Sequence, residues 1–241
     1  MFSDKTLVAL GCSFTVGIFE DDNCVNDPST CHQRSWAAKL GNVANFKQVV
    51  NLAISGSSNY RSERVLLEYL RKNTKDIVVV FALTELSRFE TVNTQNFNTK
   101  VKLEMREGFC YTPETITGLD DPNVSDEKKK FLEYYYSTLH SDKADIDTIN
   151  RKMLMISVLL RSLNIEHYFL PMFCDPNNLQ EQQLGFKIPI IPCYSSIGTK
   201  VSARTWMNHR YAFGYCGHHD HAANQALAEH IYREIKEIRN E

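Results

Sequence analysis

The chain has 241 residues, of which 43% are hydrophobic and 23% charged; 27 basic and 29 acidic side chains give a formal net charge of −2. This length and composition allow a sizeable buried core, which excludes wholesale disorder. The balanced charge supplies no net basic field to hold nucleic acid or an anionic membrane. We therefore expect neither as a partner.

Targeting and redox signals point to the cytoplasm. No apolar run approaches the roughly 20 residues that span a bilayer. The apolar stretch near the N-terminus, 7–11, is too short for a signal peptide and has no basic segment before it. The seven cysteines show no small-scaffold spacing, so we interpret them as reduced thiols.

Four aliphatic runs predict strands, and four stretches of helical apolar spacing predict helices. The predicted strands are 6–10, 48–53, 76–83 and 165–172, and the predicted helices are centred on 36–43, 63–72, 146–163 and 222–239. The third strand, DIVVVFAL, is apolar throughout, which is typical of a parallel sheet covered on both faces. The alternation predicts a three-layer α/β/α sandwich with a mostly parallel, flavodoxin-like central sheet.

Residues 91–143 interrupt this pattern with a polar, irregular stretch. We expect an insertion within a single domain, 1–241, with its own helix around the aromatic patch FLEYYY at 131–136. The patch is expected to dock the insertion, with sugar stacking as the alternative. The insertion is also the candidate surface for a homo-oligomer or another protein partner.

The chemistry is expected at the carboxyl ends of the strands, where ligands bind in open parallel sheets. The candidate loops there are 11–17, 51–59, 82–85 and, before the last helix, 217–221. A hydroxyl nucleophile needs a nearby base and donors for the oxyanion. Ser13 is the candidate nucleophile, a late histidine the base, and the Gly56 N–H an oxyanion donor.

These loops resemble the blocks of the SGNH/GDSL hydrolases. Gly11-Cys12-Ser13-Phe14 resembles the nucleophile block, with Cys12 where the family usually has Asp. Residues 51–56 resemble the second block, whose glycine donates its N–H to the oxyanion. Gly217-His218, followed by Asn224 and Ala228, resembles the final block, which supplies the base. The resemblance covers 5–90 and 145–239 and is greatest to the SGNH-like proteins of tailed phages.

The resemblance implies a serine esterase or carbohydrate O-deacetylase that acts on a small acyl ester or acetylated carbohydrate without cofactor or metal. It also implies a location in the host cytoplasm or on the virion. The base is His218 or, as second choice, His221. Thr84 stands where the family has an oxyanion-binding Asn.

The family usually has an Asp three residues before the catalytic histidine, and this Asp is absent here. The residue at that position is Tyr215 for His218 and His218 for His221. Asp175 or Asp220 would have to orient the base, unless a backbone carbonyl does so.

Other interpretations stay open. The alternative function is a catalytically silent SGNH-like phage structural or binding protein; a further one is a phosphate binder that uses the 11–17 loop. The histidines and cysteines near 216–221 invite a zinc site, but their spacing matches no standard one. Asn59 is expected to be a helix N-cap or a substrate contact. Arg88 is expected to form a structural ion pair with Glu85 or Glu90.

Overall fold

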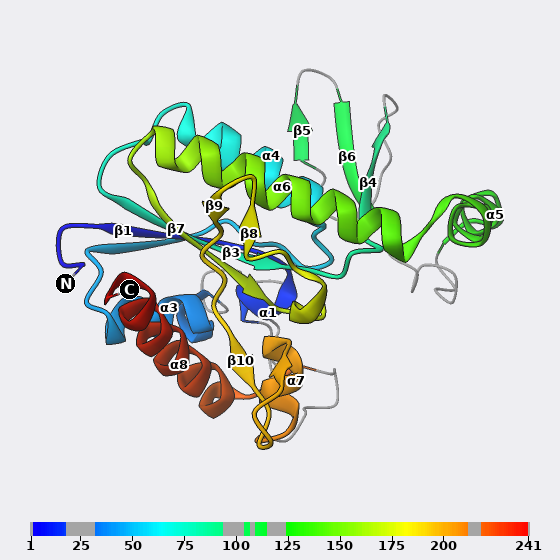
Figure 1. Cartoon of the computed structure of the whole chain (residues 1–241). Coiled ribbons are helices and arrows are strands. Elements are labelled where there is room, and N and C mark those ends of the chain that lie inside the picture. The colour runs from blue at the N-terminus through cyan, green and yellow to red at the C-terminus, as the bar shows by residue number, and fades with distance from the viewer. Residues whose placement is uncertain are drawn as a thin grey trace.

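The computed structural model describes residues 2–17, 32–93, 104–106, 109–114, 124–211 and 218–240. Its central sheet has four parallel strands in the order β2-β1-β3-β7 (Figure 1). These are β1 (Thr6–Leu10), β2 (Gln48–Asn51), β3 (Ile77–Leu83) and β7 (Glu166–Pro171). The predicted α/β fold and parallel sheet are confirmed, with strand ends within two residues of those expected.

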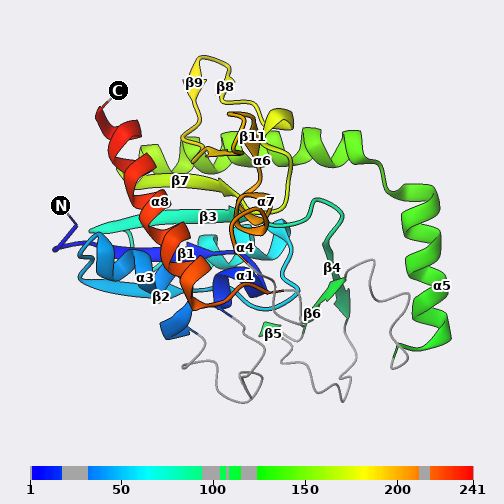
Figure 2. The ribbon, with the colours of Figure 1, turned by 90° about the horizontal axis from the view of Figure 1, so that it is seen from below.

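Helices cover both faces of the sheet. One face packs against α3 (Trp36–Val43) and α8 (His221–Asn240), and the other against α4 (Asn59–Leu70) and α6 (Asp142–Ser162) (Figures 1 and 2). Alternation along β1 divides the core, because Leu7 and Ala9 join the α3/α8 side whereas Val8 and Leu10 join the α4/α6 side. All seven residues of β3 are buried, as expected for a strand covered on both faces.

The insertion contains more structure than its sequence indicates. It has a three-stranded antiparallel sheet of β4 (Phe89–Asn93), β5 (Glu104–Arg106) and β6 (Phe109–Glu114). The expected helix is present as α5 (Asp126–Tyr134) and continues as a π-helical turn, Tyr135–Leu139. These strands escaped prediction because they are short, polar and without clear alternation.

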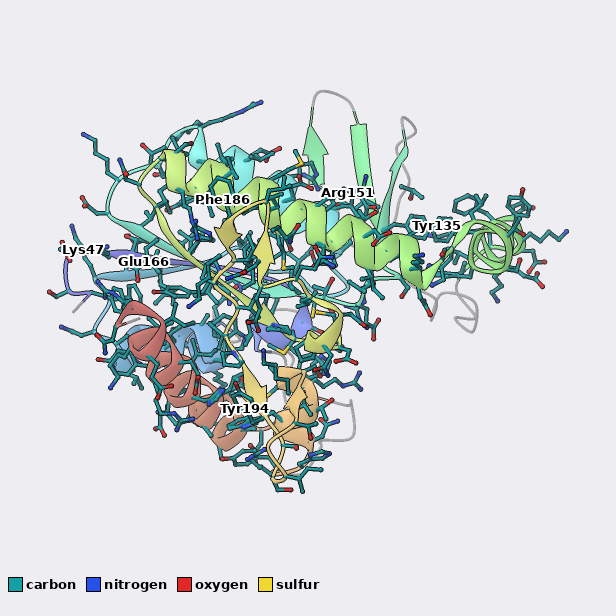
Figure 3. All side chains as sticks on the ribbon, in the orientation of Figure 1. Lys47, Tyr135, Arg151, Glu166, Phe186 and Tyr194 are labelled. Atoms are coloured by element: carbon teal, nitrogen blue, oxygen red, sulfur yellow. The ribbon has the colours of Figure 1, made fainter. Side chains whose placement is uncertain are left out.

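The aromatic patch docks the insertion helix against β4. The rings of Phe89 and Tyr135 lie 4.0 Å apart, and the Tyr136 hydroxyl donates to the Ser87 carbonyl at 3.2 Å. Tyr135 lies far from the central sheet, beside α5 (Figure 3). The predicted docking role of the patch is therefore confirmed for these residues.

Short elements connect β7 to α8, in a stretch where the sequence predicts neither strand nor helix. They are a 3₁₀ turn (Pro176–Asn178), β8 (Gln182–Gln183), β9 (Phe186–Lys187), β10 (Cys193–Tyr194), β11 (Lys200–Val201) and α7 (Ala203–Asn208). Helix α7 begins at an N-cap, because the Ser202 hydroxyl accepts from the Thr205 N–H at 3.2 Å. Among the described residues, no helix has the length and apolar character needed to span a membrane.

Candidate active site

Ser13 lies where β1 leads into the short helix α1 (Ser13–Val16), at the carboxyl edge of the sheet (Figure 1). The turn depends on Gly11, which has φ +149°. A Cβ at Gly11 would collide with Thr15 Oγ1 and would stand 3.0 Å from the Cβ of Ala82. Only glycine therefore lets the strand end so close to β3 and still place Ser13, 7% exposed, at the sheet edge.

Cys12, the residue before Ser13, is a buried free thiol. Burial raises its pKa above the ordinary 9.0, and the nearby Arg88 charge and hydrogen bonds from Phe14, Ser13 and Arg88 offset this only in part. The thiol is thus protonated at neutral pH and is a poor nucleophile. Of these two neighbours, Ser13 is the better candidate.

The loop after β2 is tied directly to the Ser13 turn. Asn51 Nδ2 donates to the Thr15 carbonyl at 2.6 Å, and Asn51 Oδ1 accepts from the Ala53 N–H at 3.1 Å. Gly56 follows with φ +73°, and a Cβ there would meet no atom within 4 Å. The space on the Cβ side of Gly56 is therefore open, and the role of Gly56 as an oxyanion donor stays a prediction.

Asn59 has a different role from the N-cap that the sequence suggests. The cap of α4 is Ser58, whose hydroxyl accepts from the Arg61 N–H at 3.1 Å, so the predicted cap is wrong by one residue. Asn59 Oδ1 instead accepts from the Thr84 N–H at 2.9 Å, and Asn59 Nδ2 donates to the Thr84 carbonyl at 3.3 Å. This amide thus fixes the end of β3.

Thr84 is completely buried at that strand end. Among the residues that the structure describes, its hydroxyl makes only a long contact, 3.5 Å, with the Glu85 carbonyl oxygen. The hydroxyl would lose little by turning toward another acceptor, and its predicted role as an oxyanion donor stays a prediction.

The three described histidines before or at the start of α8 have different environments. The His218 ring lies 4.7 Å from the ring of Phe14, the residue after Ser13. His219 is buried, and its Nε2 lies 2.8 Å from Asn208 Oδ1 of α7. His221 is the first residue of α8 and is exposed.

The His219 ring also meets Phe14, edge to face at 6.1 Å, so His218 is the nearer of two histidines that the fold packs against the Ser13–Phe14 turn. Within the described residues no hydrogen bond joins Ser13 Oγ to a histidine. Such bonds are often long before substrate binds.

The two candidate orienting acids both serve helix starts. Asp220 Oδ1 accepts from the Ala223 N–H at 2.9 Å and so caps α8. Asp175 Oδ1 accepts from the Asn177 N–H at 2.9 Å and caps the 3₁₀ turn. Across the described residues, neither carboxylate forms a hydrogen bond or an ion pair with a histidine ring.

Two arginines beside Ser13 complete the site. Arg88 pairs with Glu85 at 3.0 Å, which confirms the expected ion pair, while Glu90 pairs with Arg64. Sequence reasoning missed Arg204 of α7, whose guanidinium lies 5.7 Å from the Phe14 ring centre. No sequence signal marked Arg204, because α7 itself was not predicted.

In the parts of the chain that the structure describes, no group of three or more His, Cys, Asp or Glu is placed to hold a metal ion. Cys24, Cys31, Cys216 and Gly217 lie outside the described residues. An open depression of about 230 Å³ runs along α4, on the sheet face opposite α1, and its lining includes Arg64, Arg71, Glu63 and Glu68.

Neither a family model nor a curated protein matches the sequence. Solved structures with a similar fold include TesA, with 14% identity, TM-score 0.45 and 96% of this chain and 98% of that chain covered. Another is the psychrotrophic esterase EstA from Pseudoalteromonas sp., inhibited by monoethylphosphonate. It has 11% identity and a TM-score of 0.45, with 99% of this chain and 100% of that chain covered. A third is a protein assigned to the lipolytic G-D-S-L family from Desulfitobacterium hafniense DCB-2. It has 13% identity and a TM-score of 0.40, with 95% of this chain and 99% of that chain covered. Likenesses at these values assign neither a family nor an activity to this chain.

Proposed function

We propose that the protein is a serine ester hydrolase with Ser13 as nucleophile and His218 as base. The observation that carries this is the packing of His218 on Phe14, 4.7 Å between rings, directly beside Ser13. The buried, protonated Cys12 supports Ser13 as the reacting group. The open space on the Cβ side of Gly56 supports an oxyanion held from the neighbouring loop.

The proposed reaction passes through an acyl-enzyme. Ser13 Oγ attacks the ester carbonyl while its proton passes to His218, and the N–H groups of Ser13 and Gly56 and the Thr84 hydroxyl stabilise the oxyanion. Collapse of this intermediate breaks the ester bond, and the His218 proton goes to the leaving alcohol. Water then attacks the acyl-enzyme by the same route and releases an acid. The substrate class is an acyl ester or an O-acetylated carbohydrate.

A fluorophosphonate probe, which labels activated serines, tests the proposal. We expect the wild type to be labelled and Ser13→Ala not. His218→Ala is expected to slow labelling by about 10²-fold or more, as for loss of a general base. His221→Ala is the matched control and changes the rate only a few-fold. The reverse result for the two histidines would make His221 the base.

The second candidate is a silent scaffold of the same fold, with the 91–143 insertion as its interface. It is favoured by the engagement of Asp175 and Asp220, the two predicted orienting acids, in helix caps. A folded wild type that resists the probe would overturn the hydrolase proposal in favour of this one. The phage resemblance and the location in the cytoplasm or virion stay predictions.

A further inference from the structure

Two arginines and two phenylalanines lie together beside Ser13. The guanidinium carbons of Arg88 and Arg204 stand 5.3 and 5.2 Å from the ring centre of Phe173, which follows β7. The Phe173 ring meets Phe14 edge to face at 4.9 Å. The aromatic pair thus holds two cationic groups next to the candidate nucleophile.

The charge of this arginine pair is only partly compensated. Glu85 pairs with Arg88, whereas among the described residues no acidic side chain pairs with Arg204. Arg204 Nε and Arg88 Nη1 are both buried and have no oxygen acceptor in the described part of the chain, although Arg88 also hydrogen-bonds the Cys12 sulfur. Buried N–H donors nearly always have acceptors, so these two indicate a ligand that brings its own.

A second arginine that stacks on a phenylalanine, elsewhere in the fold, has an acidic partner. Arg239 lies 5.0 Å from the Phe2 ring, but it also faces Glu166 at 3.6 Å. Glu166 lies at the beginning of β7, at the opposite edge of the sheet from α1 (Figure 3). Stacking on a ring is therefore compatible with an ordinary ion pair, and Arg204 differs from Arg239 in having none with the residues that the structure describes.

We propose that Arg204 and Arg88 bind an anionic group of the ester substrate, a carboxylate or a phosphate, that is separate from the reacting ester. The inference rests on the proposed function, because it places this anion beside Ser13. A guanidinium presents planar N–H pairs that match carboxylate and phosphate oxygens. Phe14 and Phe173 orient Arg204, and Glu85 orients Arg88, so little side-chain freedom is lost on binding.

The test compares two 4-nitrophenyl esters of equal acyl length, the hemiadipate with a terminal carboxylate and the neutral hexanoate. Spontaneous hydrolysis is subtracted. A charge-assisted hydrogen bond is worth about ten- to a hundredfold in affinity. We expect the wild type to prefer the hemiadipate in kcat/KM by about that factor, and Arg204→Met to abolish the preference.

Arg239→Met is the matched control, because it removes an arginine from a phenylalanine ring at the far edge of the sheet. It is expected to leave the preference unchanged. Arg204→Lys keeps the charge but loses the planar fork, and is expected to retain only part of the preference. If Arg204→Met does not fold, the partial loss of the ester preference in Arg204→Lys tests the proposal in its place.

Binding of free anions gives a readout that needs no turnover. We expect millimolar adipate or inorganic phosphate to raise the melting temperature of the wild type and of Arg239→Met, but not of Arg204→Met. The anion with the larger effect identifies the group as carboxylate or phosphate.

The outcomes separate this inference from the hydrolase proposal. Fluorophosphonate labelling and equal turnover of both esters, with no effect of Arg204→Met, would overturn the anion site alone. Anion binding that depends on Arg204, in a protein that resists labelling, would support the anion-binding site and overturn only the hydrolase. Absence of labelling and of Arg204-dependent binding would overturn both.

Discussion

Asn59 holds both backbone polar groups of Thr84 with one side-chain amide, at 2.9 Å to the N–H and 3.3 Å to the carbonyl. The two residues come from α4 and from the end of β3, and both are buried. The pair thus joins the second and third candidate loops at the sheet edge that carries Ser13.

Replacement of Asn59 by alanine should destabilise the fold. Both Thr84 groups would lose their partner in a buried setting, so we expect the free energy of unfolding to fall by about 2–4 kcal/mol. Urea denaturation measures this. The control is Asn73→Ala, because Asn73 Nδ2 donates to the Tyr69 carbonyl at an exposed site, and its loss should cost about 0.5 kcal/mol or less. Equal effects of the two variants would contradict a special role for Asn59.

Gly11→Ala should disrupt the turn that presents Ser13. The new Cβ would collide with Thr15 Oγ1 and press on Ala82, at a φ of +149° that alanine rarely adopts. We expect a loss of about 2–4 kcal/mol in unfolding free energy, from strain and overpacking combined. Gly198→Ala serves as control: its φ is +82° but a Cβ there meets no atom within 4 Å, so only backbone strain of about 1–2 kcal/mol applies. A Gly11 variant as stable as the Gly198 variant would show that the turn relaxes.

His167 should make the fold sensitive to mild acid. Its Nε2 lies 3.0 Å from Ser157 Oγ and its Nδ1 3.2 Å from the Ile165 carbonyl. Burial lowers its pKa from 6.5 to about 4, the strongest of several effects that include the opposing charges of Arg161 and Glu166. Between these values the unfolded chain binds a proton that the folded chain does not, so stability falls as pH drops from 6.5 toward 4.

Between pH 7 and pH 5 we expect His167 to contribute a loss of about 2 kcal/mol. Denaturation curves at several pH values measure it as the slope that His167→Gln removes. His230, whose pKa burial also lowers, adds a slope that both proteins share. His209→Gln, at an exposed histidine, should leave the slope as in the wild type. An unchanged slope in His167→Gln would show that this side chain takes up its proton without cost.

The strands and helices of the sheet were predictable because their apolar spacing matches what a covered parallel sheet buries. DIVVVFAL could only be an interior strand, and β3 is one. The insertion strands and α7 were not predictable, since their stability depends on contacts such as Phe89 with Tyr135 rather than on local pattern. The Asn59 cap was misassigned because Ser58 and Asn59 are both good caps in sequence, and only the helix start decides between them.

The sequence by itself determined the order of strands and helices along the chain and the set of loops that meet at one sheet edge. These follow from periodicity and backbone sterics, which act locally. The tertiary structure decided that His218 packs on Phe14, that Asp175 and Asp220 serve as helix caps, and that Arg204 lies beside Arg88. Such choices depend on contacts between residues distant in the chain, which no local pattern specifies.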